Sequence, residues 1–226
     1  MAIPAAASEL NNLLQIISGT VGMLENIWGG KPGSEKYFEM LRASVDRAAK
    51  VTAQLVKHVG GTEQRILLRP GLAASANGQP APQSTLDKQR RILVVDDEPM
   101  ALALAKHVLS QAGFEAVTAQ SGFECLDLVR ARPGGFDLIL LDLSMPIMDG
   151  EETFDRLRAI DPNVVVLLNT GFIEKHRLDR MMAAGLAGFL RRPYRPDEVI
   201  EQIQTVLASA QSSRTEASPD AVVATF

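Results

Sequence analysis

The stretch RRILVVDDEP, Arg90–Pro99, decides how most of this chain is expected to fold. Its four consecutive apolar residues, Ile92–Val95, do not alternate with polar ones, which is typical of a strand buried on both faces of a parallel sheet. The run stops at two adjacent carboxylates, Asp96 and Asp97. Ligands bind at the carboxyl ends of the strands in open α/β sheets, so both acids stand where a site is expected.

A second predicted strand ends in the same way. Leu138–Leu141 is another apolar run, and Asp142 follows it directly. Carboxylates gathered at one edge of a sheet repel one another unless a cation lies between them, and carboxylate oxygens are ligands that Mg²⁺ prefers. Any one of these acids could simply cap the helix that follows it. Together, Asp96, Asp97 and Asp142 favour a magnesium site.

Strand and helix patterns alternate from Arg90 onward. Strands are predicted near 91–95, 115–119, 138–141, 164–169 and 187–190, and helices near 99–112, 122–131, 151–159, 175–184 and 196–209. Five successive βα units predict an α/β domain over residues 90–210, with a five-stranded parallel sheet covered by helices on both faces. Residues 211–226 are polar and poor in core formers, so we expect a disordered tail.

Two amphipathic helices are predicted before the α/β domain. Apolar residues recur every three or four positions over 8–28 and again over 34–59. Two such helices cannot enclose a core alone, so residues 1–62 are predicted to form a four-helix bundle with a second copy. Residues 63–89 are rich in Gly, Ala, Pro, Ser and Gln and predict a flexible linker, in which only Ile66–Leu68 could dock elsewhere.

The composition excludes several classes of protein. The 226 residues are 46% hydrophobic and 22% charged, as in an ordinary globular protein, and the net charge of −4 gives no sign of nucleic-acid binding. A single cysteine, Cys125, argues against a disulfide framework or a thiolate zinc cluster. We find no apolar run of membrane-spanning length and no secretory signal pattern. We therefore expect a cytoplasmic protein without nucleic-acid or membrane partners.

Four blocks of the sequence carry a family resemblance. VVDDEP at 94–99, LLDLSMPIMDG at 140–150, NTG at 169–171 and FLRRPY at 189–194 resemble the signature blocks of response-regulator receiver domains, in the same order. The resemblance implies a flavodoxin-like (βα)5 fold and a role in two-component signal transduction. It implies a phosphoryl group received from a partner histidine kinase or histidine phosphotransfer protein. The phosphorylated domain would then signal by protein contact or act as a phosphate sink.

The resemblance also assigns roles at the acidic site. It makes Asp142 the phosphoacceptor and gives Asp96 and Asp97 to Mg²⁺, with the backbone carbonyl of Ser144 as a further ligand. Physical chemistry agrees with these roles, because a carboxylate attacks a phosphoryl group only when the charge on the phosphoryl oxygens is neutralised.

Three later residues are implied to respond to phosphorylation. The resemblance makes Thr170 the switch hydroxyl and Phe189 the switch aromatic. Arg192 stands where the family has a lysine, before a proline whose preceding peptide bond is a candidate for the cis form. Arginine keeps the positive charge but is longer, planar and forked. Arg192 could therefore contact the phosphoryl group or pair elsewhere.

The N-terminal helices resemble the dimerisation and phosphotransfer hairpin of sensor histidine kinases. The resemblance rests on SELNNLL at Ser8–Leu14 and on LRASVDRAAKVTAQLV at Leu41–Val56. The family has a phosphoaccepting histidine where this chain has Ser8, and serine has no imidazole to form a phosphoramidate. Ser8 is therefore predicted to be a helix N-cap at a degenerate phosphohistidine position. Residues 61–89 are too few to hold an ATP-binding domain, so no kinase activity is expected.

Two alternatives to the interpretation as a two-component signalling protein stay open. The hairpin could act as an inhibitor or adaptor that mimics the dimerisation domain of a histidine kinase. The chain could also be a phosphatase or phosphotransferase with an aspartyl-phosphate intermediate. A haloacid-dehalogenase-type enzyme would need a second acid two residues after the nucleophile, where this chain has Ser144. We therefore favour a signalling protein that catalyses only its own phosphorylation and dephosphorylation.

Overall fold

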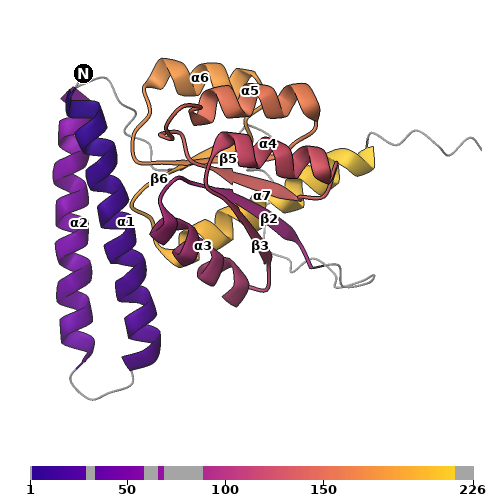
Figure 1. The fold of residues 1–226 in the computed structure, drawn as a ribbon. Helices are drawn as coiled ribbons and strands as arrows, with labels where there is room; N and C mark the ends of the chain where they lie inside the picture. The colour runs from indigo at the N-terminus through magenta and orange to yellow at the C-terminus, as the bar shows by residue number, and fades with distance from the viewer. Residues whose placement is uncertain (1, 29–33, 59–65, 69–88, 217–226) are drawn as a thin grey trace, which may run out of the picture.

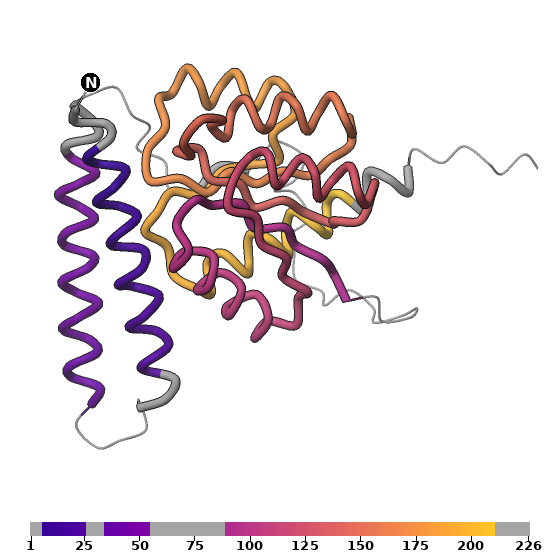
Figure 2. Tube along the Cα trace, in the orientation of Figure 1, coloured from indigo at the N-terminus to yellow at the C-terminus, as the bar shows by residue number. Residues whose placement is uncertain are grey.

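The chain folds into a helical hairpin and an α/β domain that lie side by side (Figure 1). The computed structural model describes residues 2–28, 34–58, 66–68 and 89–216. The hairpin consists of α1 (Ala2–Trp28) and α2 (Glu35–His58), as expected from the two apolar stripes. Figure 2 shows the same arrangement along the Cα trace.

Helix α1 begins six residues before the position predicted from the sequence. It starts at Ala2, so Ser8 lies inside the helix and the prediction that Ser8 is its N-cap is wrong. The physical reason is that Ala5–Ala7 are strong helix formers. Pro4 does not prevent this start, because proline is tolerated in the first turn of a helix.

Five parallel strands alternate with helices in the α/β domain, which confirms the predicted parallel sheet. The strands are β2 (Arg91–Val95), β3 (Glu115–Ala119), β4 (Leu138–Leu141), β5 (Val166–Thr170) and β6 (Gly188–Arg191). The helices are α3 (Pro99–Gln111), α4 (Gly122–Ala131), α5 (Gly150–Ile160), α6 (Lys175–Ala183) and α7 (Pro196–Glu216). Across the sheet these five strands stand in the order β6-β5-β4-β2-β3, so β2 and β4 are neighbours.

A sixth strand corrects the predicted strand number, and it lies at Ile66–Leu68, the one part of the predicted linker that was expected to be able to dock elsewhere. β1 (Ile66–Leu68) pairs antiparallel with β6, Ile66 opposite Leu190. Three consecutive apolar residues in an otherwise small and polar segment form a strand that covers the open edge of the sheet. The rest of the predicted linker, apart from Gln89, lies outside the described residues.

The C-terminal helix is also longer than predicted. α7 continues to Glu216, so the expected disordered tail cannot begin at residue 211. Residues 211–216 contain neither glycine nor proline, so nothing in them stops a helix that is already formed. Residues 217–226 lie outside the described part of the chain.

The sheet is buried on both faces, as its apolar strands predict. Figure 1 shows α4, α5 and α6 on one face and α3 and α7 on the other. In β2, Leu93 and Val95 join the core cluster that contains Phe154 of α5, whereas Ile92 and Val94 join the cluster on the opposite face. Each fully buried side chain of this kind stabilises the fold by about 1.5–3 kcal/mol.

Helix α1 packs against both α2 and the α/β domain. Gly19 lies directly on the side chain of Leu104 in α3, where any larger residue would overlap it. Leu14 and Val21 are buried, whereas Leu10, Leu13, Ile17 and Leu24 remain exposed. Within the described residues, none of the helices is both long and apolar enough to span a bilayer.

Candidate functional site

Three acidic side chains meet at the carboxyl ends of two neighbouring strands, β2 and β4. Asp96 and Asp97 follow β2, and Asp142 follows β4. The two strands are parallel neighbours with Val95 opposite Leu141, so both end at the same edge of the sheet. One carboxylate oxygen from each acid lies within 4.8 Å of the other two. The structure thus brings together the three acids that the sequence predicted.

The environment of Asp142 differs from that of the other two acids. Its side chain is buried, and among the described residues neither of its oxygens has a hydrogen-bond partner. Burial raises the pKa of Asp142 to about 6 against the opposing effect of Arg192, and the charges of Asp96 and Asp97 raise it further. Burial and the charge of Asp96 also raise the pKa of the more exposed Asp97. A buried carboxylate whose oxygens accept no hydrogen bond, with two further acids beside it, fits a hard divalent cation such as Mg²⁺.

Arg192 reaches this site from the end of β6. Its guanidinium donates to the carboxylate of Asp96, and Nη2 lies 3.4 Å from Oδ1 of Asp142. Nε donates to Oδ1 of Asn169 at 3.1 Å, and Nη1 donates to Oδ1 of Asn12 at 2.8 Å. Burial would lower the pKa of Arg192, but the charges of Asp142 and Asp96 outweigh that effect and raise it. The forked side chain can make these contacts together because it carries five N–H donors.

The two predicted switch residues lie on the neighbouring strands. Thr170 ends β5, and its hydroxyl donates to the carbonyl of Phe172 at 3.0 Å and accepts from its N–H at 3.3 Å. Phe189 of β6 is fully buried in the core cluster that contains Phe154. The Arg192–Pro193 peptide bond is cis, as the family resemblance implied. The roles of Thr170 and Phe189 as switches stay predictions.

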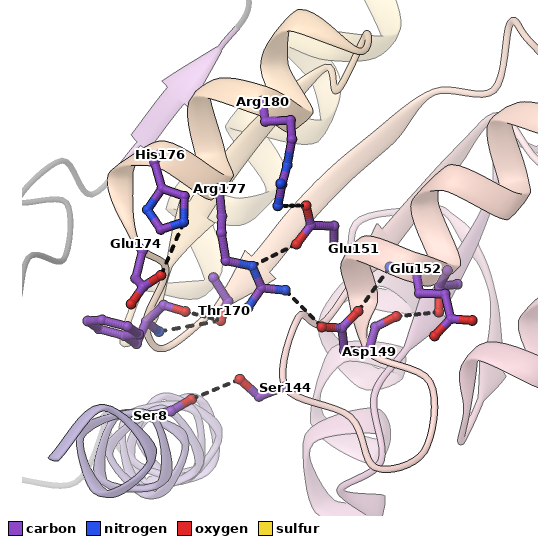
Figure 3. A network of polar contacts seen from close by, with 12 residues as sticks. Ser8, Ser144, Asp149, Glu151, Glu152, Thr170, Glu174, His176, Arg177 and Arg180 are labelled. Carbon is purple, nitrogen blue, oxygen red and sulfur yellow. Dashed lines mark hydrogen bonds and ion pairs between the residues drawn. The ribbon is translucent and has the colours of Figure 1, made fainter. Parts of the chain in front are cut away.

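The loop after Asp142 is held by a polar network that the sequence did not reveal (Figure 3). Arg177 of α6 donates to Asp149 at 2.8 Å and to Glu151 at 2.7 Å, and so ties α6 to the start of α5. Gly150 packs so closely on the backbone of Asp142 that a side chain there would overlap it. No local sequence signal identifies Arg177, since its partners lie on another helix.

Polar residues of α1 also reach this edge of the sheet, which the sequence did not predict. Figure 3 shows Ser8 facing Ser144, with 3.3 Å between their hydroxyl oxygens. Three further side chains of α1 make hydrogen bonds to the loops after β5 and β6, namely Asn11, Asn12 and Gln15. The Asn-Asn pair was visible in the sequence, but nothing there indicated its partners.

Comparison with known proteins agrees with this geometry. The response regulator receiver domain family matches residues 92–204. The chain belongs to this family. Its receiver domain is 31% identical over 118 residues to sporulation initiation phosphotransferase F of Bacillus subtilis (strain 168), covering 52% of this chain and 93% of that protein.

Two further matches show how far the similarity extends. The chain is 31% identical over 135 residues to the transcriptional regulatory protein ZraR of Salmonella typhimurium, covering 60% of this chain but only 30% of ZraR. A CheY-like response regulator receiver domain protein from Methanospirillum hungatei JF-1 has a crystal structure that is 26% identical, with a TM-score of 0.51. That match covers 55% of this chain and 98% of the other.

The comparisons confirm the receiver-domain resemblance, and with it the expectation of a two-component, phosphoryl-accepting signalling protein. The family match begins at residue 92, after the hairpin. The likeness of α1 and α2 to a histidine-kinase hairpin therefore stays a prediction.

Proposed function

We propose that the receiver domain accepts a phosphoryl group on Asp142. The observation that carries this proposal is that the two buried acids, Asp96 and Asp142, differ in the hydrogen bonds that their carboxylate oxygens accept. One oxygen of Asp96 accepts the N–H of Glu98 at 2.9 Å and the other accepts from Arg192. Both oxygens of Asp142 lack a hydrogen-bond partner within the described part of the chain. A nucleophile needs an oxygen whose lone pairs are not already committed, so Asp142 is the acceptor.

The donor set around Asp142 fits a magnesium ion. Carboxylate oxygens of Asp96, Asp97 and Asp142, with the backbone carbonyl of Ser144, would hold it. When bound, Mg²⁺ supplies the positive charge that offsets the charge on the phosphoryl oxygens. Arg192 adds a second positive charge in a region from which water is largely excluded, where electrostatic interactions are strong.

Phosphorylation would act on the two switch residues. A phosphoryl group on Asp142 offers Thr170 a charged acceptor, which is stronger than its present acceptor, the carbonyl of Phe172. Movement of Thr170 leaves space beside β5 for Phe189, which changes the surface formed by α6 and α7. The phosphorylated domain then signals by protein contact, or serves as a phosphate sink if no partner reads the change. The donor is a histidine kinase or a histidine phosphotransfer protein: a carboxylate oxygen of Asp142 forms the new P–O bond while the P–N bond to the donor's histidine breaks and the imidazole leaves. The location is the cytoplasm.

Labelling with a small phosphodonor tests the acceptor directly. The full chain is incubated with acetyl phosphate and Mg²⁺, and the phosphoryl group is detected by intact-protein mass spectrometry. We expect labelling that is lost in Asp142→Asn and on chelation of Mg²⁺. The matched control is Asp155→Asn, which makes the same change at an exposed position of α5. Equal labelling of the wild type and Asp142→Asn would refute the assignment.

We also propose that the hairpin, residues 1–62, joins two copies of the chain. The support is a half-exposed apolar stripe on α1. Leu10, Leu13, Ile17 and Leu24 are between 39% and 52% exposed, and their spacing places them on one side of the helix. Tyr37, Leu41 and Val51 of α2 are exposed as well. Such a surface is stable in water when a second hairpin covers it, giving a four-helix bundle.

Oligomeric state decides this second proposal. Light scattering of the full chain at micromolar concentration should give the mass of a dimer. Leu13→Glu combined with Ile17→Glu should give a monomer, because two charges would enter an apolar interface. Thr20→Glu is the control for charge alone, since Thr20 is also exposed on α1. A monomeric wild-type chain would contradict the bundle.

A further inference from the structure

One side of α1 is polar, although the rest of the helix is patterned for apolar contacts. Ser8, Asn11 and Gln15 follow one another at helical spacing, and their side chains are 7%, 1% and 6% exposed. Buried polar side chains are stable only when they are hydrogen-bonded, so this side of α1 requires polar partners. Those partners come from the receiver domain.

The partners are backbone groups of the loops after two strands. Nδ2 of Asn11 donates to the carbonyl of Gly171 at 2.6 Å, directly after Thr170. Oε1 of Gln15 accepts the N–H of Tyr194 at 2.7 Å, two residues after Arg192. Each bond satisfies a buried backbone group, and such bonds are expensive to lose once water is excluded. Helix α1 is therefore docked at specific points and is not merely adjacent to the receiver domain.

The docked helix also lies in close contact with the loop that follows Thr170. A Cβ atom added to Gly171 would lie 2.8 Å from the carbonyl oxygen of Ser8 and 2.9 Å from Cβ of Asn11. On the other side, Ser8 lies against Ser144 in the loop after β4. Helix α1 thus contacts the loops after β4, β5 and β6, which surround Asp142.

Arg192 connects this docking to the chemistry of the acidic site. The same guanidinium donates to Asn12 of α1 through Nη1 and contacts Asp96 and Asp142 through Nη2. A phosphoryl group on Asp142 would bring three charged acceptor oxygens next to this side chain. Because hydrogen bonds to charged acceptors are about twice as strong as those to neutral ones, the planar guanidinium would shift toward the phosphoryl group through Nη2, and this shift would weaken the bond from Nη1 to Asn12.

We propose that docking of α1 and phosphorylation of Asp142 oppose each other, so that phosphorylation releases the N-terminal hairpin from the receiver domain. The proposal rests on Asp142 being the phosphoacceptor. Two contacts couple the events: the shared Arg192, and the loop at Thr170–Gly171, which cannot move toward a phosphoryl group without disturbing Ser8 and Asn11. By linkage, a phosphoryl group weakens docking by the same factor by which docking weakens phosphorylation. A protein donor that reached Asp142 across the same three loops would likewise have to displace α1.

A reversible cross-link can hold α1 in place. The hydroxyl oxygens of Ser8 and Ser144 are 3.3 Å apart, so the pair Ser8→Cys and Ser144→Cys can form a disulfide after a small shift. The native Cys125 should not interfere, because it is buried and burial raises the pKa of its thiol to about 12. The control pair is Glu9→Cys with Ser144→Cys, since Glu9 is exposed on α1 and should not cross-link.

Two measurements on the full chain test the coupling. We expect acetyl phosphate with Mg²⁺ to label the oxidised Ser8→Cys/Ser144→Cys variant about 5- to 150-fold less, at equilibrium, than the same variant after reduction. In the reduced variant, Mg²⁺ with beryllofluoride, which mimics the phosphoryl group, should slow formation of the disulfide. Equal labelling of the oxidised and reduced forms would overturn the coupling and leave Asp142 as the acceptor. Loss of labelling from both forms and from the wild type would instead overturn the proposed function.

A second variant tests the coupling between docking and phosphorylation without a cross-link. Asn12→Ala deletes the bond to Arg192 and should increase hydrogen exchange along α1 and raise the extent of phosphorylation. Thr20→Ala is the matched control on the exposed side of the same helix. Failure of the Ser8→Cys/Ser144→Cys pair to form a disulfide, with unchanged hydrogen exchange in Asn12→Ala, would refute the docked arrangement on which the proposal depends.

Discussion

Replacing Asp142 by asparagine should stabilise the folded receiver domain at neutral pH. The substitution keeps the shape of the side chain and removes a negative charge that is 1% exposed. The pKa of Asp142 is about 6, compared with the ordinary value of 3.8. Because one pKa unit corresponds to about 1.36 kcal/mol, holding this carboxylate ionised in the fold costs about 3 kcal/mol at pH 7. Asparagine avoids that cost.

The effect should depend on pH in a definite direction. Between pH 3.8 and about 6 the folded protein binds a proton at Asp142 more tightly than the unfolded chain does. Unfolding then releases protons, so the contribution of this group to stability falls as the pH rises through that window. Below pH 3.8 the carboxyl group is protonated in both states. The advantage of Asp142→Asn should therefore be largest at pH 7 and vanish at the acidic end of the window.

Urea unfolding at several pH values, with EDTA present, measures this directly. The free energy of unfolding of Asp142→Asn should exceed that of the wild type by about 3 kcal/mol at pH 7. Asp155→Asn, on the exposed side of α5, should differ little from the wild type. A variant no more stable than the wild type at pH 7, or one with an equal gain at every pH, would show that the buried charge of Asp142 does not destabilise the fold. Adding Mg²⁺ should stabilise the wild type more than the variant, because the variant lacks one ligand.

Three further substitutions test other parts of the structure. Arg192→Lys should lower the free energy of unfolding by about 1–3 kcal/mol in urea titrations, since one ammonium cannot reach both Asn12 and Asp96 as the guanidinium does. Unchanged stability would show that the simultaneous contacts of Arg192 with Asn12 and Asp96 do not stabilise the fold. Ile147→Gly should raise the thermal midpoint and stabilise by about 1 kcal/mol, because Ile147 has a φ of 69° and is 93% exposed. Phe154→Ala should cost about 3–5 kcal/mol, because the ring is fully buried; a loss under about 1 kcal/mol would show that the core around it is loosely packed.

The sequence was enough to place the acidic site because the buried strands are visible as local apolar runs, and because parallel strands in any sheet end at the same edge. Ile92–Val95 and Leu138–Leu141 are uninterrupted apolar runs, which indicate strands buried on both faces. Parallel strands end at one edge of their sheet, so the acids that follow them, Asp96, Asp97 and Asp142, had to meet there. Periodicity likewise indicated α1 and α2, since it records which side of each helix avoids water.

Tertiary structure alone decided what the polar residues contact. Asn12 and Arg192 are far apart in the chain, and each would be an ordinary exposed side chain in a different packing arrangement. The antiparallel pairing of β1 with β6 also depends on an edge that exists only once the sheet has formed. Hydrophobic patterning determines that a surface is buried but not which surface covers it, because apolar contacts are non-directional. Hydrogen bonds are directional, so the position of α1 over the loops around Asp142 is fixed by partners that only the folded chain brings within reach.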